Sequence, residues 1–359
     1  MLHKTIIHVA SNRSLKAGAQ PDPRKPYPNS PKKDFFDHES NANLTAFARF
    51  AGTISTGRQL TEMQLHFCKY PWFAKNVLGL QPPGVWQPEL LKESTDYVSS
   101  LSNHMAQNNL KYVASFRHGF DTTSLNGFMH ALALSEGLHS LGFAVSEMSW
   151  ASHGKPLFTA YVSDMDNCQA SVPASEQQLE LDIQAAGGAD KVIAVTHSMG
   201  APLLLATLLN RYYKANGKPE KLHSIWLVSP DIDTRVFLND YVDALKASAH
   251  KVYVLVSEKD LPLHLSELFR EFGVDNNHPR LGQAHNIPVI PGITFVNDTK
   301  NDHGFLGHML RLRTIALILK ELMGKGIGIA PTFLHNTNIC NEIRGGASPI
   351  YALKRTCLW

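Results

Sequence analysis

The residue pattern around a serine in the middle of the chain suggests that this serine could be a nucleophile. The stretch 191–200 begins with β-branched and small apolar residues, stops at Thr-His-Ser-Met-Gly, and continues as a Leu- and Ala-rich run. This pattern predicts a strand, a sharp turn and a helix, with Ser198 at the apex of the turn and its hydroxyl exposed above the sheet. Gly200 supplies the small residue needed after the serine, whereas Thr196 departs from the glycine expected before it. An ordinary strand leading into a core helix is the alternative interpretation of this stretch.

Acidic and histidine side chains follow later predicted strands. A serine hydroxyl is a weak nucleophile until an imidazole accepts its proton, and a carboxylate orients that imidazole and stabilises its charged form. Asp260 follows the apolar run 252–256 and His303 follows 292–296, so the chain carries the order Ser, Asp, His. We therefore predict Ser198 as the nucleophile, Asp260 as the orienting carboxylate, and His303 as the general base and then acid.

Each partner of the serine has an alternative. His308 lies five residues after His303, and we favour His303 because His308 falls a turn into the last predicted helix. Asp231 and Asp233 follow the preceding strand and could either replace Asp260 or cap the next helix. We favour Asp260 over both.

A second loop could stabilise negative charge on a substrate. The loop 117–121 follows a predicted strand and contains a glycine that lets the backbone turn. The backbone N–H groups of Phe120 and Met199 are predicted to form an oxyanion hole for the substrate carbonyl oxygen. A plain strand-to-helix loop is the alternative interpretation. His118 and His197 flank these groups, and we expect them to shape the two loops through hydrogen bonds rather than to transfer protons.

Strands and helices alternate regularly from residue 111 onward. Apolar runs without polar alternation are typical of strands that are covered on both faces, and intervening helices of this length imply a parallel sheet with helices on both faces. Ligands of such sheets bind beyond the carboxyl ends of the strands, which is where the candidate residues fall. The predicted strands are 112–116, 143–150, 191–196, 223–229, 251–256 and 292–296, and the predicted helices are 126–141, 176–186, 201–216, 234–249, 263–272 and 304–323.

The two ends of the chain differ from this regular part. Residues 4–10 predict a first strand, and the Pro-rich, polar stretch 16–43 predicts a flexible strap over the surface. Aromatic residues without a clear period follow, and 88–108 has a helical period. The chain is therefore divided into an N-terminal strand, strap and cap-like segment at 1–109, an α/β core at 110–325, and a tail at 326–359 that is neither helical nor strand-like.

Composition and charge exclude several classes of function. The 359 residues are 43% hydrophobic and 18% charged, as in an ordinary globular protein, and 34 basic and 31 acidic residues are scattered, which argues against nucleic-acid binding. The 18 histidines and four cysteines lack metal-binding spacing, so we expect no metal, no cofactor and reduced thiols. The start lacks the apolar core of a signal peptide, and 192–209 falls short of the roughly 20 uninterrupted apolar residues that a membrane span needs. We therefore expect a cytoplasmic protein with no membrane span.

Several motifs together resemble a known group of proteins. They are His-Gly-Phe-Asp-Thr (118–122), Ser-Trp-Ala-Ser (149–152), Tyr161-x-x-Asp164, Thr-His-Ser-Met-Gly (196–200), Ser-Pro-Asp-Ile-Asp (229–233) and Val-Ser-Glu-Lys-Asp (256–260), with the histidine after the last strand and the opening strand 6–13. The sequence resembles the α/β-hydrolase superfamily, and most of all its bacterial members classed as domain of unknown function 900. The resemblance covers 110–325 well and 1–15 weakly, and implies an α/β-hydrolase fold with a mostly parallel central sheet. Besides Thr196, Arg117 departs from the pattern, because a charge before the oxyanion loop could repel or recruit a ligand.

These features favour a serine hydrolase that cleaves carboxylic esters through an acyl-enzyme. The expected partner is a small-molecule ester, and the segments 44–109 and 152–173 could cover the cleft and form an acyl pocket. An acyltransferase with the same triad is one alternative. A non-catalytic binding or scaffold protein with a misaligned triad is the other. Metal-dependent hydrolysis is disfavoured because the ligand spacing is absent.

Overall fold

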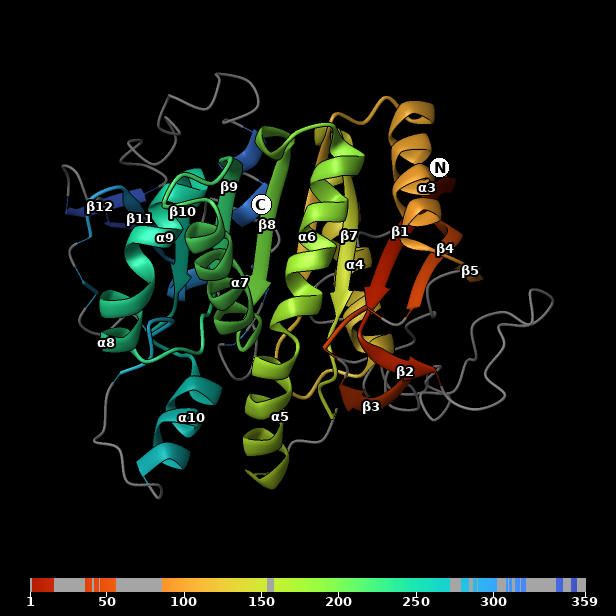
Figure 1. Cartoon of the computed structure of the whole chain (residues 1–359). Coiled ribbons are helices and arrows are strands. Elements are labelled where there is room, and N and C mark those ends of the chain that lie inside the picture. Colours follow the sequence, from red (N-terminus) through yellow and green to blue (C-terminus); the bar gives the residue numbers. More distant parts are fainter. Residues whose placement is uncertain are drawn as a thin grey trace. The chain divides into compact units, whose positions relative to one another are not determined.

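The computed structural model divides into two compact units, one up to Val192 and the other from Ile193 (Figure 1). Each unit is described by itself. The structure describes residues 2–15, 36–40, 42–44, 46–55, 86–153, 158–271, 279–283, 287–288, 290–301, 308, 310–311, 314–316, 318–320, 340–344 and 350–353.

The first unit contains a twisted sheet with parallel and antiparallel parts. Its strand order is β6-β7-β1-β4-β5, in which β6, β7 and β1 run parallel while β4 runs antiparallel to both β1 and β5. A separate antiparallel pair, β2 with β3, follows β1. The bounds are Leu2–Ser11 for β1, Arg13–Leu15 for β2, Phe36–Ser40 for β3, Ala46–Ser55 for β4, Trp86–Leu91 for β5, Tyr112–Arg117 for β6 and Phe143–Ser149 for β7.

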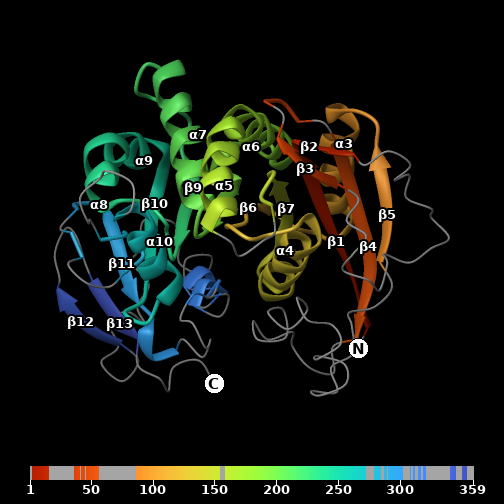
Figure 2. The same cartoon turned by 90° about the horizontal axis from the view of Figure 1, so that it is seen from below.

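Helices cover both faces of this first sheet. Figure 2 shows α4 on one face and α3 with α6 on the other. The Thr123 hydroxyl accepts a hydrogen bond from the Asn126 N–H and caps α4, and Gly187, at φ 73°, ends α6. The bounds are Ser94–Gln107 for α3, Ser124–Leu138 for α4, Phe158–Ala170 for α5 and Val172–Ala186 for α6.

The second unit is an almost entirely parallel sheet. Its order is β8-β9-β10-β11-β13-β12, and the pairs from β8 to β13 are parallel while β12 runs antiparallel to β13. The central strands are buried, and the paired Trp226 and Tyr253 rings stack at 4.3 Å. The bounds are Val192–His197 (β8), Gly200–Lys214 (α7), Leu222–Val228 (β9), Thr234–Val236 (α8), Val242–Ser248 (α9), Ala249–Val256 (β10), Leu261–Glu271 (α10), Ile293–Asn297 (β11), Cys340–Arg344 (β12) and Ile350–Leu353 (β13).

The predicted strands after residue 111 are confirmed, as are the helices between them. Of the helix predicted at 304–323, residues 314–316 and 318–320 are helical, and His308 lies before them rather than within a helix. Two other predictions, a helix that begins at residue 88 and a tail without strands, are wrong. The tail contains two strands, β12 and β13, which pair beside β11. Strand β4 lies in the aromatic-rich segment and β5 replaces the start of the helix predicted at 88–108. Helix α5 lies in the predicted insertion 152–173. Short strands gain their stability from pairing with distant segments, so the local period does not reveal them.

A pair of histidines is buried between β1, β4 and α3. The ring of His8 stacks on His104 at 5.5 Å, and its Nε2 lies 3.1 Å from the Ser100 hydroxyl oxygen. Burial, together with the neighbouring His104 and Arg49, holds the pKa of His8 well below its ordinary value. In the folded protein, His8 therefore stays neutral at a pH at which an exposed histidine would take up a proton.

Acidification should therefore destabilise the protein through His8. The unfolded chain binds a proton at His8 near pH 6.5 and the folded protein resists it, so the free energy of unfolding should fall below that pH, by up to about 1.4 kcal/mol per pH unit. His8→Phe should weaken this dependence when chemical unfolding is compared at about pH 7.5 and about pH 5. His250→Phe, which changes an exposed histidine, is the control. An unchanged pH dependence in His8→Phe would contradict the prediction.

Candidate active site

Ser198 lies between β8 and α7 in a left-handed backbone conformation. Its φ is 53°, which is unfavourable for a residue with a side chain. Three backbone hydrogen bonds hold it: its N–H donates to the Val228 carbonyl at 3.0 Å, and its carbonyl accepts from the N–H groups of Ala201 at 3.0 Å and Asp231 at 3.2 Å. The strand, the turn and the helix follow each other as the sequence predicts.

Thr196 fits this turn without the glycine expected there. Its side chain is fully buried, and its hydroxyl donates to the Trp226 carbonyl on the neighbouring strand β9 at 3.3 Å. The hydroxyl group is therefore satisfied within the sheet. Gly200, at the start of α7, is also buried.

Asp260 and His308 form a close carboxylate–imidazole pair. Asp260 follows β10 and is fully buried, and His308 Nδ1 lies 2.8 Å from its Oδ1 and 2.9 Å from its Oδ2. The carboxylate also accepts a hydrogen bond from the Leu263 N–H at 3.2 Å, at the start of α10. Because Nδ1 is bound to the carboxylate, Nε2 on the opposite side of the ring is the atom that can exchange a proton with a substrate or a hydroxyl group.

The ring of His308 lies beside the turn that carries the serine. The ring centroids of His308 and His197 are 4.6 Å apart, and His197 immediately precedes Ser198 in the chain. The histidine side chain of His308 is 14% exposed, whereas Asp260 is not exposed at all. The pair therefore combines an inaccessible carboxylate with an imidazole that retains access to solvent.

The other predicted site residues of the second unit have different positions. Asp231 is buried, accepts a hydrogen bond from the Ser266 hydroxyl at 2.7 Å, and pairs with the buried Arg280 at 3.3 Å. Asp233 caps α8 by accepting from the N–H groups of Arg235 and Val236. His303 lies outside the described residues. Of the two histidines considered for the general base, His308 is the one that the structure shows in contact with Asp260.

The predicted oxyanion donors belong to different units. Phe120 follows β6 in the first unit, and its ring makes an edge contact with Tyr161 of α5 at 5.3 Å. Met199 directly follows Ser198 in the second unit and is buried at the N-terminal end of α7. The oxyanion hole that these two N–H groups could form stays a prediction. Asp121, next to Phe120, has a left-handed backbone with φ 54°.

His118 is a structural part of the first unit, as predicted from its place in the sequence. Its ring stacks on Trp150 at 5.1 Å, and its carbonyl accepts a hydrogen bond from the indole N–H at 2.8 Å. Burial, with the nearby Arg13 charge, lowers the pKa of His118 well below its ordinary value. Neutral Nδ1–H donates to the Gly119 carbonyl at 3.0 Å, and this fixes the start of the loop.

Arg117 lies in the interior of the first unit among polar side chains. Its guanidinium donates to the Ser175 hydroxyl at 3.0 Å, the Ser115 hydroxyl at 2.8 Å and the Gln178 side-chain carbonyl at 2.8 Å. Burial lowers its pKa to about 10, against the opposing effect of the nearby Asp182. The guanidinium is held by α6 and β6, so Arg117 stabilises the fold of this unit.

Sequence reasoning assigned no role to Arg13, Ser152 or Asp164, although all three belong to a buried network. Arg13 donates to the carbonyls of Ser152 and Thr122, each at 2.9 Å, and Ser152 donates to Asp164 at 2.5 Å. Ser152 and Asp164 belong to motifs on which the family resemblance rests, and Arg13 follows a predicted strand. Polar residues shortly after an apolar strand were the signal for Arg13 and Ser152, whereas Asp164 lies on helix α5 and only its motif could have revealed it.

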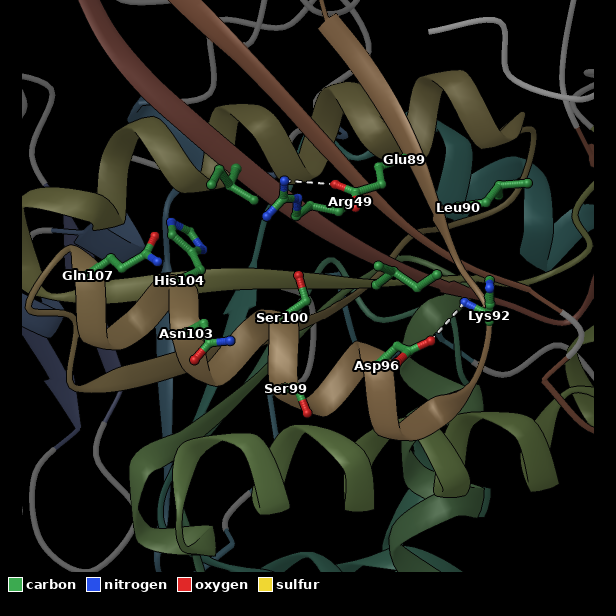
Figure 3. A pocket seen from close by; sticks show the side chains of 12 residues that line it. Arg49, Glu89, Leu90, Lys92, Asp96, Ser99, Ser100, Asn103, His104 and Gln107 are labelled. Atoms are coloured by element: carbon green, nitrogen blue, oxygen red, sulfur yellow. Dashed lines mark hydrogen bonds and ion pairs between the residues drawn. The ribbon is translucent and has the colours of Figure 1, made fainter.

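A polar groove of about 560 Å³ opens between α3 and the strands β4 and β5 (Figure 3). Arg49 of β4 and Glu89 of β5 are paired in the sheet and form an ion pair of 2.7 Å at its edge, and the Lys92 N–H donates to the Asp96 carboxylate at 3.2 Å. The residues that line it include neither the serine nor the Asp–His pair. Over the described ranges, no three His, Cys, Asp or Glu side chains are grouped to hold a metal ion, and no helix is long and apolar enough to cross a membrane.

The parallel strands, the left-handed serine between a strand and a helix, and the Asp–His pair after later strands define an α/β hydrolase. A family model described as "Alpha/beta hydrolase of unknown function (DUF900)" matches residues 93–309, more than half of the chain. The chain belongs to this family.

Solved structures similar to the chain include three that are distant in sequence. An esterase/lipase from an uncultured bacterium is 15% identical, with 61% of this chain and 78% of that chain covered and a TM-score of 0.33. A hormone-sensitive lipase from a metagenome library is 11% identical, with 66% of this chain and 91% of that chain covered and a TM-score of 0.34. The ydeN gene product from B. subtilis is 17% identical, with 45% of this chain and 80% of that chain covered and a TM-score of 0.28. No curated protein matches the chain.

Gly282→Ala should disturb the backbone that supports Ser198. A Cβ atom at Gly282 would lie 2.6 Å from the Ser229 carbonyl carbon and 2.8 Å from the Pro230 nitrogen, just before the Asp231 N–H that holds the Ser198 carbonyl. Because backbone atoms cannot move aside freely, we expect a loss of about 1–3 kcal/mol in the free energy of unfolding, measured by chemical denaturation.

A substitution at another glycine provides the control for this prediction. Gly217 follows α7, has a left-handed φ of +79°, and would place a Cβ atom no closer than 3.4 Å to the Tyr212 side chain. Asn tolerates that conformation, so Gly217→Asn should change the stability by much less. Equal stabilities of Gly282→Ala and Gly217→Asn would contradict the backbone contact inferred at Gly282.

Proposed function

We propose that the protein is a serine hydrolase that cleaves carboxylic esters through an acyl-enzyme. Ser198 is the nucleophile, His308 the general base and then acid, and Asp260 the carboxylate that orients His308. The observation that carries this proposal is the pairing of His308 Nδ1 with both oxygens of the buried Asp260, while its ring contacts the residue next to Ser198. This choice replaces His303, which the sequence alone favoured.

The first half of the proposed reaction forms the acyl-enzyme. The Ser198 oxygen attacks the ester carbonyl carbon as its proton passes to His308 Nε2, and the buried Asp260 stabilises the imidazolium that results. Negative charge develops on the carbonyl oxygen. The N–H of Met199, and that of Phe120 as the sequence predicts, are the proposed donors for this charge. The alcohol then leaves with the proton from His308, and the acyl group remains on Ser198.

The second half of the proposed reaction returns the serine to its free form. A water molecule gives a proton to His308 Nε2 and attacks the acyl carbon, after which the carboxylic acid leaves and Ser198 regains its proton. An alcohol or amine in place of this water would turn the same residues to acyl transfer. No metal or organic cofactor takes part in the proposed steps.

Labelling with a fluorophosphonate probe and turnover of a p-nitrophenyl ester test this proposal. We expect the folded protein to be labelled and active, and Ser198→Ala to lose both. His308→Gln and Asp260→Asn should lower kcat by on the order of 10⁴-fold, because the proton of Ser198 then has no correctly oriented acceptor. His303→Gln is the matched control and should retain most of the activity.

Probe labelling and ester turnover can also contradict the proposal. A folded protein without labelling or turnover would favour the non-catalytic scaffold. Loss of activity in His303→Gln together with full activity in His308→Gln would return the role of general base to His303. Thermal unfolding of every variant ensures that the compared proteins are folded.

A further inference from the structure

Hydrogen bonds and a ring contact connect helix α5 and the residue after it to the loops that follow β1, β6 and β7 of the first unit. Tyr161, Asp164 and Asn167 occur at intervals of three residues on this helix and contact the loops after β6 and β7. The Asn167 amide donates to the Ala151 carbonyl at 2.8 Å, and Ser171, just after α5, accepts from Asn12 after β1 at 2.8 Å. In Figure 1, α5 lies on the side toward which the arrows of β1 and β7 point.

Asp164 is the fully buried centre of these contacts. Its carboxylate accepts hydrogen bonds from the Ser152 hydroxyl at 2.5 Å and from the backbone N–H of His153 at 2.9 Å, and the His153 Nδ1 lies 2.6 Å from it. A carboxylate can only accept hydrogen bonds, so the one hydroxyl proton of Ser152 is directed toward Asp164. The lone pairs of the Ser152 oxygen are then available to another donor.

That other donor is the backbone N–H of Thr122, which lies 3.1 Å from the Ser152 oxygen. The carbonyl of Thr122 accepts a hydrogen bond from the buried Arg13 at 2.9 Å, and its hydroxyl donates to the Phe120 carbonyl at 3.1 Å. Both backbone groups of Thr122 are therefore held, next to the left-handed Asp121. The conformation of the loop at 120–122 depends on this chain of hydrogen bonds.

We propose that Asp164 is a positioning residue that, through Ser152 and the Thr122 N–H, fixes the loop at 120–122 and with it the backbone N–H of Phe120. The inference rests on the proposed function, in which Phe120 is an oxyanion donor. Asp164 acts at a distance from the reacting atoms, and it directs the proton of Ser152 so that Ser152 must accept from Thr122. A donor that is misaligned in an oxyanion hole costs rate and leaves substrate binding largely unchanged.

Three variants separate this role from a general effect on folding. Asp164→Asn removes the charge that directs Ser152, and Ser152→Ala removes the oxygen that accepts from Thr122. Ser152→Thr keeps the hydroxyl and should restore function. Asp166→Asn is the matched control, because Asp166 lies exposed on the same helix two residues away.

The first measurement is steady-state kinetics with an ester and with the thionoester that carries sulfur in place of the carbonyl oxygen. We expect Asp164→Asn and Ser152→Ala to lower kcat for the ester by about 10- to 100-fold with little change in KM. Sulfur accepts hydrogen bonds weakly, so the preference for ester over thionoester should fall in the same two variants. A smaller folded fraction would lower both rates equally and leave that preference unchanged.

The second measurement is amide hydrogen exchange in the peptide that covers residues 118–123, which does not depend on activity. Exchange should be faster in Asp164→Asn and Ser152→Ala than in the wild type, Asp166→Asn or Ser152→Thr. Unchanged exchange, or an unchanged ester preference, would overturn the positioning role while leaving the serine hydrolase intact. Faster exchange in a protein that the fluorophosphonate probe fails to label would instead overturn the proposed function and the oxyanion role with it.

Discussion

The left-handed backbone at Ser198 is the constraint on which the candidate site depends. A non-glycine residue in this conformation costs about 1–3 kcal/mol, and it persists only where its surroundings hold it. The next strand supplies one support through the Val228 carbonyl, and the loop after that strand supplies another through the Asp231 N–H. Ser229, at the end of β9, is left-handed as well, with φ 45°. Two parallel strands thus end in strained turns that support each other, and Ser198, which is buried rather than exposed as predicted, lies at their carboxyl ends.

Two buried aspartates after adjacent strands show how a partner decides the role of a carboxylate. Asp231 pairs with the buried guanidinium of Arg280, a side chain with hydrogen-bond donors only, so this pair stabilises the fold. Asp260 pairs with the imidazole of His308, whose second ring nitrogen, Nε2, faces away from the carboxylate. The proposed function assigns proton transfer to the second pair only, although both carboxylates are buried after strands.

The first unit uses buried polar groups to fix its loops and helices. Burial raises the pKa of Asp182 to about 6, against the hydrogen bonds and the Arg117 charge that oppose this shift, and burial also raises the pKa of Tyr97, which donates to Asp182 at 2.9 Å. Arg117 and Gln178 complete this network between α6 and β6. A second network, with Arg13 and Asp164, holds the loops beyond the strands. Directional hydrogen bonds in a medium of low dielectric constant specify these loops more closely than apolar packing could.

Local patterns in the sequence determined the alternating strands and helices after residue 111, the turn at Ser198 and the position of Asp260 after an apolar strand, because each depends on neighbours in the chain. Strands β4, β12 and β13 escaped prediction because their stability comes from pairing with segments far away in sequence. The sequence favoured His303 over His308, yet only folding decides which imidazole meets a carboxylate 48 residues earlier in the chain. The hydrogen bonds that connect Asp164 to Thr122 through Ser152 likewise depend on tertiary structure, because helix α5 and the loops after β6 and β7 must first be brought together.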